Sequence, residues 1–140
     1  MGLYGTNFKP QRGAYRLEQK AKARERKATE ERIMREAKAR DRNVCRFPKC
    51  AWKELRTECA HLEHRGMGGN PALDRTQRHK LITLCIRHHD MFDTGDIDIA
   101  PVTSRGTDGP VAFYEREPER GNMAHVYTER INLISEQRGA

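Results

Sequence analysis

The distribution of hydrophobic and polar residues changes several times along this chain of 140 residues and divides it into segments. Residues 1–13 hold few apolar residues and several glycines, and we expect them to form a flexible arm. Residues 14–42 contain neither Gly nor Pro and are rich in Ala, Glu, Lys and Arg, which predicts one long helix. The apolar positions of this helix are few: Leu17, Ala21, Ala28, Ile33 and Ala37. So thin a stripe predicts a charged helix that buries little of its surface.

The rest of the pattern predicts a compact domain over residues 43–117 and a tail. A short apolar run, Leu81–Leu84, leads into a cysteine. Alternating apolar residues on both sides of a turn-rich segment predict a β-hairpin over about residues 97–117. Residues 118–140 are expected to form a tail with one short strand or one short helix around 124–136, and the pattern does not decide between the two.

Composition and charge add two constraints. Only 36% of the residues are hydrophobic and 34% are charged, so a core built from apolar side chains alone would be small, and a bound metal would help to stabilise it. The formal net charge of +7 favours a polyanionic partner, most commonly nucleic acid. Residues 14–42 contribute 11 Lys/Arg and 6 Asp/Glu, a net +5. This segment is therefore either a solvated helix or linker, or a helix that grips DNA.

Four residues have the spacing of zinc ligands. Cys45 and Cys50 form Cys-x4-Cys, and Cys85 and His88 form Cys-x2-His. No apolar segment is long enough to cross a bilayer or to act as a leader, so we expect a cytoplasmic protein without a membrane partner. In that reducing compartment such pairs bind metal more often than they form disulfides, and we predict a structural zinc site. The alternative is a group of small buried residues without metal. Cys59 is expected to be a buried thiol outside the set.

Three further histidines, His61, His64 and His89, lie in the same segment and are candidates for catalysis. One histidine can activate water as a general base while another holds a divalent metal against a phosphate. Alternatively, His64 is a solvent-facing loop residue beside a glycine-rich turn. Rings that converge on one solvent-open point would favour catalysis, and rings that diverge would favour a binding module.

Three stretches of the chain resemble a known family. They are Cys-Arg-Phe-Pro-Lys-Cys at 45–50, His-Leu-Glu-His-Arg-Gly-Met-Gly-Gly-Asn-Pro at 61–71 and Leu-Cys-Ile-Arg-His-His at 84–89. Over about residues 43–113 the chain resembles the HNH endonucleases, and in particular small phage-encoded members. The resemblance implies a β-hairpin and a helix around a metal. The expected fold class is therefore α+β: a small zinc-stabilised ββα-metal core with a long N-terminal charged helix and a C-terminal β-hairpin.

The resemblance also implies roles for individual residues. His61 falls where the family has its general base. His89 falls on the family's last histidine, a ligand of the catalytic metal, which would be Mg²⁺, Mn²⁺ or a second Zn²⁺. The chain departs from the family at Ala60, where a metal ligand is usual, and at Lys80, where an asparagine is usual. His64 is a candidate to replace the missing ligand.

Basic residues surround the predicted site and are expected to contact phosphates. They are Arg65, Arg75, Arg78, Lys80 and Arg87. The leading functional prediction is a metal-dependent endonuclease that cuts DNA, with double-stranded DNA as the expected partner. The alternative, which Ala60 and Lys80 favour, is a degenerate HNH-like module that keeps zinc and DNA affinity without cutting. A phage packaging accessory that docks through the long helix is a further alternative.

Overall fold

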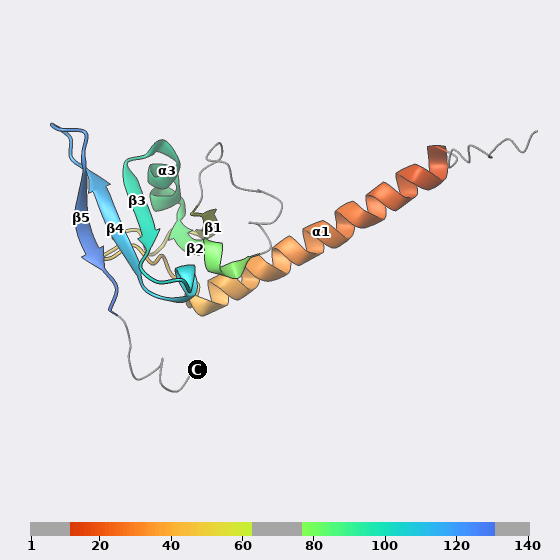
Figure 1. Cartoon of the computed structure of the whole chain (residues 1–140), viewed down its shortest axis with the longest axis horizontal. Helices are drawn as coiled ribbons and strands as arrows, with labels where there is room; N and C mark the ends of the chain where they lie inside the picture. Colours follow the sequence, from red (N-terminus) through yellow and green to blue (C-terminus); the bar gives the residue numbers. More distant parts are fainter. Residues whose placement is uncertain (1–11, 63–76, 131–140) are drawn as a thin grey trace, which may run out of the picture.

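The computed structural model describes residues 12–62 and 77–130, which form a small α+β fold with two antiparallel sheets (Figure 1). The helices are α1 (Arg12–Arg40) and α3 (Ile86–Thr94), and the 3-10 turns are η1 (Arg78–Lys80) and η2 (Gly106–Asp108). The strands are β1 (Thr57–His61), β2 (Leu81–Cys85), β3 (Ile97–Pro101), β4 (Val111–Arg116) and β5 (Met123–Thr128). The expected α+β class is confirmed at this level. Residues 1–11 of the predicted arm lie outside the described residues.

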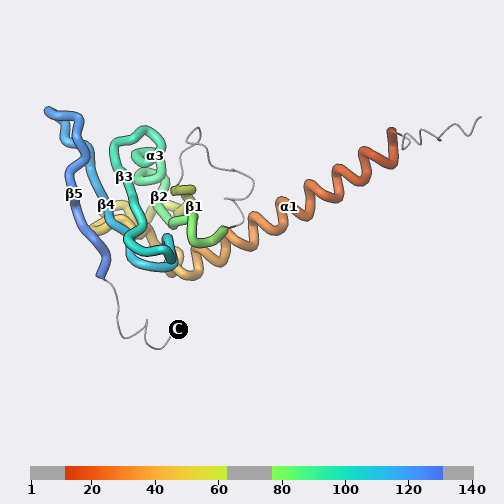
Figure 2. The backbone as a smooth tube through the Cα atoms, viewed as in Figure 1, coloured from red at the N-terminus to blue at the C-terminus, as the bar shows by residue number. Residues whose placement is uncertain are grey.

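The long helix α1 confirms the prediction from composition, with bounds slightly earlier than expected. It ends in a Schellman-type cap, in which the Asn43 N–H donates to the Lys38 carbonyl at 2.7 Å. Arg42 and Asn43 adopt left-handed φ values of 57° and 56° there. Within α1 only Ala37 is buried, and residues 12–28 are all exposed. Figures 1 and 2 show this exposed part of the helix extending away from the sheets.

The β1–β2 hairpin leads directly into α3. Cys85, the last residue of β2, is the N-cap of α3, and its Sγ accepts a hydrogen bond from the His88 N–H. The helix ends at Gly95, whose φ of 83° provides a left-handed cap. Strand β2 is buried at every position, so its cysteine reaches the helix from inside the domain.

The second sheet has the order β3-β4-β5. The hairpin predicted over about 97–117 is confirmed as β3 and β4, with Ile99 opposite Phe113. The undecided element of the tail is the strand β5, which pairs with β4. The sheet therefore continues past residue 117, the predicted end of the compact domain. Every residue of β5 is exposed or half-buried, so the strand lacks the apolar alternation that would have predicted it.

The hydrophobic core joins both sheets, α3 and the turn after α1. Its members are Cys45, Phe47, Cys50, Ala60, Ile82, Leu84, Cys85, Phe92, Ile97, Ile99, Val111 and Phe113. Phe92 of α3 and Phe113 of β4 are the largest of the fully buried side chains. Three members of this short list are candidate metal ligands, so the metal site lies inside the core rather than on the surface.

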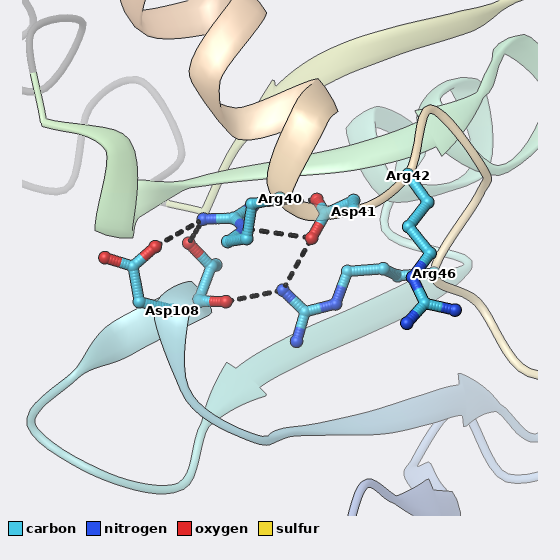
Figure 3. Close-up of a pocket in the computed structure, with 6 residues that line it drawn as sticks. Arg40, Asp41, Arg42, Arg46 and Asp108 are labelled. Atoms are coloured by element: carbon cyan, nitrogen blue, oxygen red, sulfur yellow. Dashed lines mark hydrogen bonds and ion pairs between the residues drawn. The ribbon is translucent and has the colours of Figure 1, made fainter. Parts of the chain in front are cut away.

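A network of charged residues, the α1 junction, joins the end of α1 to the domain (Figure 3). It consists of Arg40, Asp41, Arg46 and Asp108. Arg40 donates to Asp41 at 2.7 Å and to Asp108 at 3.0 Å. Arg46 donates to Asp41 at 3.3 Å, and the Asp41 side chain is only 3% exposed. The residues that line the pocket at this place are Arg40, Asp41, Arg42, Arg46, Thr107 and Asp108. Because the buried charges of the junction pair with one another, we interpret it as a structural clamp on α1.

Candidate metal centre

Four side chains from separate segments meet in one buried group, the Cys3His cluster. Cys45 and Cys50 belong to the turn that follows α1, Cys85 ends β2, and His88 lies in the first turn of α3. Their ligand atoms, one from each residue, all lie within 4.8 Å of one another, and all four residues are buried. Lys49 adopts a left-handed φ of 54° directly before the second cysteine, where the chain turns. The structure thus brings together the four residues that the spacing predicted.

The distances within the Cys3His cluster fit a tetrahedral ion. The Sγ atoms of Cys50 and Cys85 are 3.8 Å apart. His88 Nδ1 lies 3.3 Å from the Sγ of Cys45 and 3.3 Å from the Sγ of Cys85. Tetrahedral zinc with Zn–S bonds of about 2.3 Å requires S···S edges of about 3.8 Å and somewhat shorter S···N edges. The cluster can therefore hold a metal ion such as zinc, with Nδ1 as the histidine ligand atom.

Burial shifts the pKa of two of these residues, His88 and Cys45, before an ion is bound. It lowers the pKa of His88, which favours the neutral imidazole that binds metal. It raises the pKa of Cys45 to about 12, so this thiol keeps its proton at neutral pH in the absence of metal. Metal binding must then displace the proton of the Cys45 thiol, and the apparent affinity increases with pH.

Aromatic side chains hold the imidazole of His88 in place. The Phe47 ring stacks on it with centroids 4.3 Å apart, and the centroid of the Trp52 ring lies 5.0 Å away. The Arg87 guanidinium lies over the Trp52 ring, 5.2 Å from its centroid. Because Trp52 is the single tryptophan of the chain, its fluorescence reports on the cluster.

Cys59 lies outside the Cys3His cluster, as predicted. It is a half-buried residue of β1 whose Sγ donates to the Met34 carbonyl of α1 at 3.4 Å. Burial raises the pKa of its thiol. Cys59 therefore supports the packing of β1 against α1 and provides a cysteine control for the ligand set.

His89 follows a ligand of the Cys3His cluster in sequence but does not join it. Its Nδ1 lies 2.8 Å from Glu58 Oε2 on β1, and its Nε2 lies 3.5 Å from Asp93 Oδ2 one helical turn later. The side chain is 24% exposed. The hydrogen bond with His89 is the main cause that lowers the pKa of Glu58. Two adjacent imidazoles of α3 thus lie in two different environments.

The two faces of β1 separate His61 from His89. Side chains alternate along a strand, so Glu58 and Ala60 share one face, and Cys59 and His61 share the other. Glu58 contacts His89, whereas Cys59 contacts α1. The His61 Nε2 atom is also shielded from solvent. His61 and His89 therefore do not converge on one solvent-open point, and this divergence is the arrangement expected of a binding module.

The other predicted site residues divide into two groups. His64, Arg65 and Arg75 lie outside the described residues. Arg78 forms an ion pair with Asp108 at 3.1 Å, and Lys80 is half-buried at the end of η1. Contact of any of these side chains with DNA stays a prediction.

Sequence reasoning missed Glu58 and Asp93 as neighbours of His89. A signal for each was present, because residue 58 shares a strand face with residue 60, and residue 93 is four positions after His89 on a helix. The sequence did not show that β1 packs against α3, and this packing brings the Glu58 carboxylate to the His89 ring.

No protein-family model, curated protein or solved structure matches this chain. Among the described residues, no helix has the length and apolar character needed to cross a membrane.

Proposed function

We propose that this chain is a metal-dependent endonuclease that hydrolyses DNA, with a catalytic divalent ion at His89 beside structural zinc in the Cys3His cluster. The observation that carries the proposal is the separation of two adjacent histidines. His88 is 4% exposed and belongs to the cluster, whereas the side chain of His89 is 24% exposed and pairs with carboxylates. The order β1, β2, α3 supports the proposal, because a β-hairpin followed by a helix is what the resembled family implies.

The surroundings of His89 suit a hard divalent ion. Nε2 and the Asp93 oxygen are 3.5 Å apart, a separation that two ligands of one ion can have when each bond is about 2.1 Å. Glu58 accepts from Nδ1 and would orient the ring, as carboxylates commonly do for metal-binding histidines. Glu58 and Asp93 thus place acidic groups beside His89, whereas Ala60 occupies the position where the resembled family usually has a metal ligand. A bound ion would neutralise charge on the scissile phosphate and its leaving oxygen.

His61 is proposed as the general base that activates water. It is the last residue of β1, and β1 pairs only with β2 among the described strands. Since its ring lies on the face opposite Glu58, it can share a phosphate with the ion only around the end of the strand. The role of His61 is therefore the part of the proposal that an experiment can most readily refute.

A plasmid-nicking assay with added Mg²⁺, Mn²⁺ or Ni²⁺, beside an EDTA control, tests the proposal. We expect nicking by the wild type and at least about a hundredfold loss in His61→Ala and in His89→Ala. The matched control is His125→Ala, which removes an exposed histidine of β5. Each preparation must contain one zinc per chain, so that a loss cannot be assigned to unfolding. Wild-type nicking rates in either variant would refute the assigned roles.

A second candidate function is a zinc-stabilised DNA-binding module that does not cut. The opposite faces occupied by His61 and Glu58, together with Ala60 in the core, favour it. For this candidate we expect the zinc-loaded wild type to bind DNA and to leave plasmid intact with every ion tested.

A further inference from the structure

The free part of α1, residues 12–28, has no role in the centre described above. Its residues are all exposed, and the contacts that hold α1 lie near its other end. Met34 accepts from Cys59, Lys38 donates to the Thr57 carbonyl at 2.9 Å, and Arg40 enters the α1 junction. The helix is thus clamped at one end, and its free part extends from the domain in a defined direction (Figures 1 and 2).

The charge of the molecule is concentrated on α1. This helix contains 11 Lys/Arg and 5 Asp/Glu, a net +6, in a chain whose net charge is +7. The charge is also ordered around the helix axis. Five basic residues recur every three or four positions, and we call them the basic stripe: Arg12, Arg16, Lys20, Arg24 and Lys27. At 100° per residue they occupy an arc of about 120°.

Acidic residues of the free part lie away from this arc. Glu18 and Glu25 fall on the opposite side of the helix, where Glu18 pairs with Lys22 at 3.4 Å. Within residues 12–62 and 77–130, no side chain of the basic stripe forms an ion pair. The stripe therefore presents uncompensated positive charge to solvent, whereas the opposite side is mixed.

The chemistry of the free part points to a phosphate backbone rather than to a protein or a membrane. Tyr15 and Leu17 are its exposed large hydrophobic residues, so it lacks the repeating apolar seam of a coiled coil. It likewise lacks the apolar face with which a helix enters a lipid interface. From Arg12 to Lys27 the helix spans about 22 Å at 1.5 Å per residue. Duplex DNA presents a phosphate charge about every 1.7 Å along its axis, so several phosphates lie within that length.

We propose that the free part of α1 is a duplex-DNA arm that binds backbone phosphates through the basic stripe without reading sequence. The inference rests on the proposed function for its choice of nucleic acid, and it adds the surface that provides most of the affinity. The α1 junction sets the direction of the arm, so that DNA held along α1 continues toward the β1–β2–α3 unit.

Two matched triple variants of the full chain test the arm. The stripe variant carries Arg16→Gln, Lys20→Gln and Arg24→Gln. The control variant carries Lys22→Gln, Arg26→Gln and Arg32→Gln, which remove the same charge from the rest of the helix surface. Both are made in a His89→Ala background, which prevents cleavage during binding measurements. Helix content is checked by circular dichroism, because glutamine has a helix propensity close to that of the residues it replaces.

Affinity for a DNA duplex and for an RNA duplex, both of unrelated sequence, is measured by fluorescence anisotropy from about 50 to 200 mM salt. The stripe variant should reduce the slope of log K against log salt by about 2.7, since each lost phosphate contact contributes about 0.9. Its affinity at 0.1 M salt should decrease on the order of a hundredfold or more. The control variant should change the slope by less than about one.

Equal weakening by both triples would overturn the inference, because it would show a response to net charge alone. No weakening by the stripe variant, or weakening only for duplex RNA, would also overturn it. Failure of the nuclease proposal gives a different result: the wild type would not nick plasmid, while the two triples would still differ in binding.

Discussion

Loss of the ion from the Cys3His cluster should remove the stability of the whole domain. The perturbation is Cys85→Ser, with Cys59→Ser as the matched control at the one cysteine outside the cluster. In the wild type an ion would connect Cys50 to Cys85, 35 positions apart, and Cys85 is 0% exposed. The variant leaves the other buried ligands without a complete coordination shell.

The magnitude follows from the connectivity. If the ion acts as a cross-link, closing a loop of 35 residues contributes about 4 kcal/mol through the entropy of the unfolded chain. Zinc-binding free energies of structural sites at neutral pH are larger, about 10–16 kcal/mol, and compare with total domain stabilities of about 5–15 kcal/mol. We therefore expect Cys85→Ser to lower the free energy of unfolding by at least about 4 kcal/mol. Cys59→Ser should cost less than about 1 kcal/mol, because it replaces a half-buried donor with a similar one.

The assay combines metal content with urea unfolding followed by the fluorescence of Trp52, whose ring centroid lies 5.0 Å from that of His88. The wild type and Cys59→Ser should each retain one zinc per chain after gel filtration, and a chelator should shift their unfolding midpoints downward. A Cys85→Ser protein that keeps one tightly bound zinc and the wild-type midpoint would refute the ligand assignment. Loss of zinc in Cys59→Ser would refute the assignment of Cys59 to a place outside the Cys3His cluster.

Two further predictions concern the α1 junction. Arg40→Met should lower the free energy of unfolding by about 2–4 kcal/mol, because it removes an ion-pair partner from the Asp41 carboxylate, whose side chain is 3% exposed. The control is Arg78→Met, at a side chain that is 45% exposed, which should cost less than about 1 kcal/mol in the same urea titration. Burial raises the pKa of Asp108, but hydrogen bonds from Arg78 and Arg40 outweigh it and the pKa is lowered below 3.8. The stability that this carboxylate contributes is therefore complete above its unfolded pKa and is lost as pH falls through the lower folded pKa. The difference in unfolding midpoint between wild type and Asp108→Asn should be constant from neutral pH to about pH 5 and should shrink only below about pH 4. A difference that shrinks already between pH 7 and pH 5 would contradict the ion-pair assignment.

Much of the local structure followed from sequence because it depends on neighbouring residues. The Gly- and Pro-free segment 14–42 predicted α1, and alternation around a turn predicted the hairpin of β3 and β4. The spacing of two cysteine-containing pairs predicted the Cys3His cluster, since ligand type and chain reversal are both local properties. Strand β5 was undecided because it is mostly exposed on both faces and has no apolar period to reveal it.

Tertiary structure alone decided which distant groups meet. The sequence determined that His88 and His89 are adjacent on one segment, but only the packing of β1 against α3 placed the second ring beside Glu58 and left the first in the cluster. The sequence determined the charge of α1, but only the Arg40 contacts to η2 and β2 clamped one end and left the other exposed. The physical reason is that periodicity and spacing act over a few residues, whereas strand register and the pairing of buried charges depend on the entire folded chain.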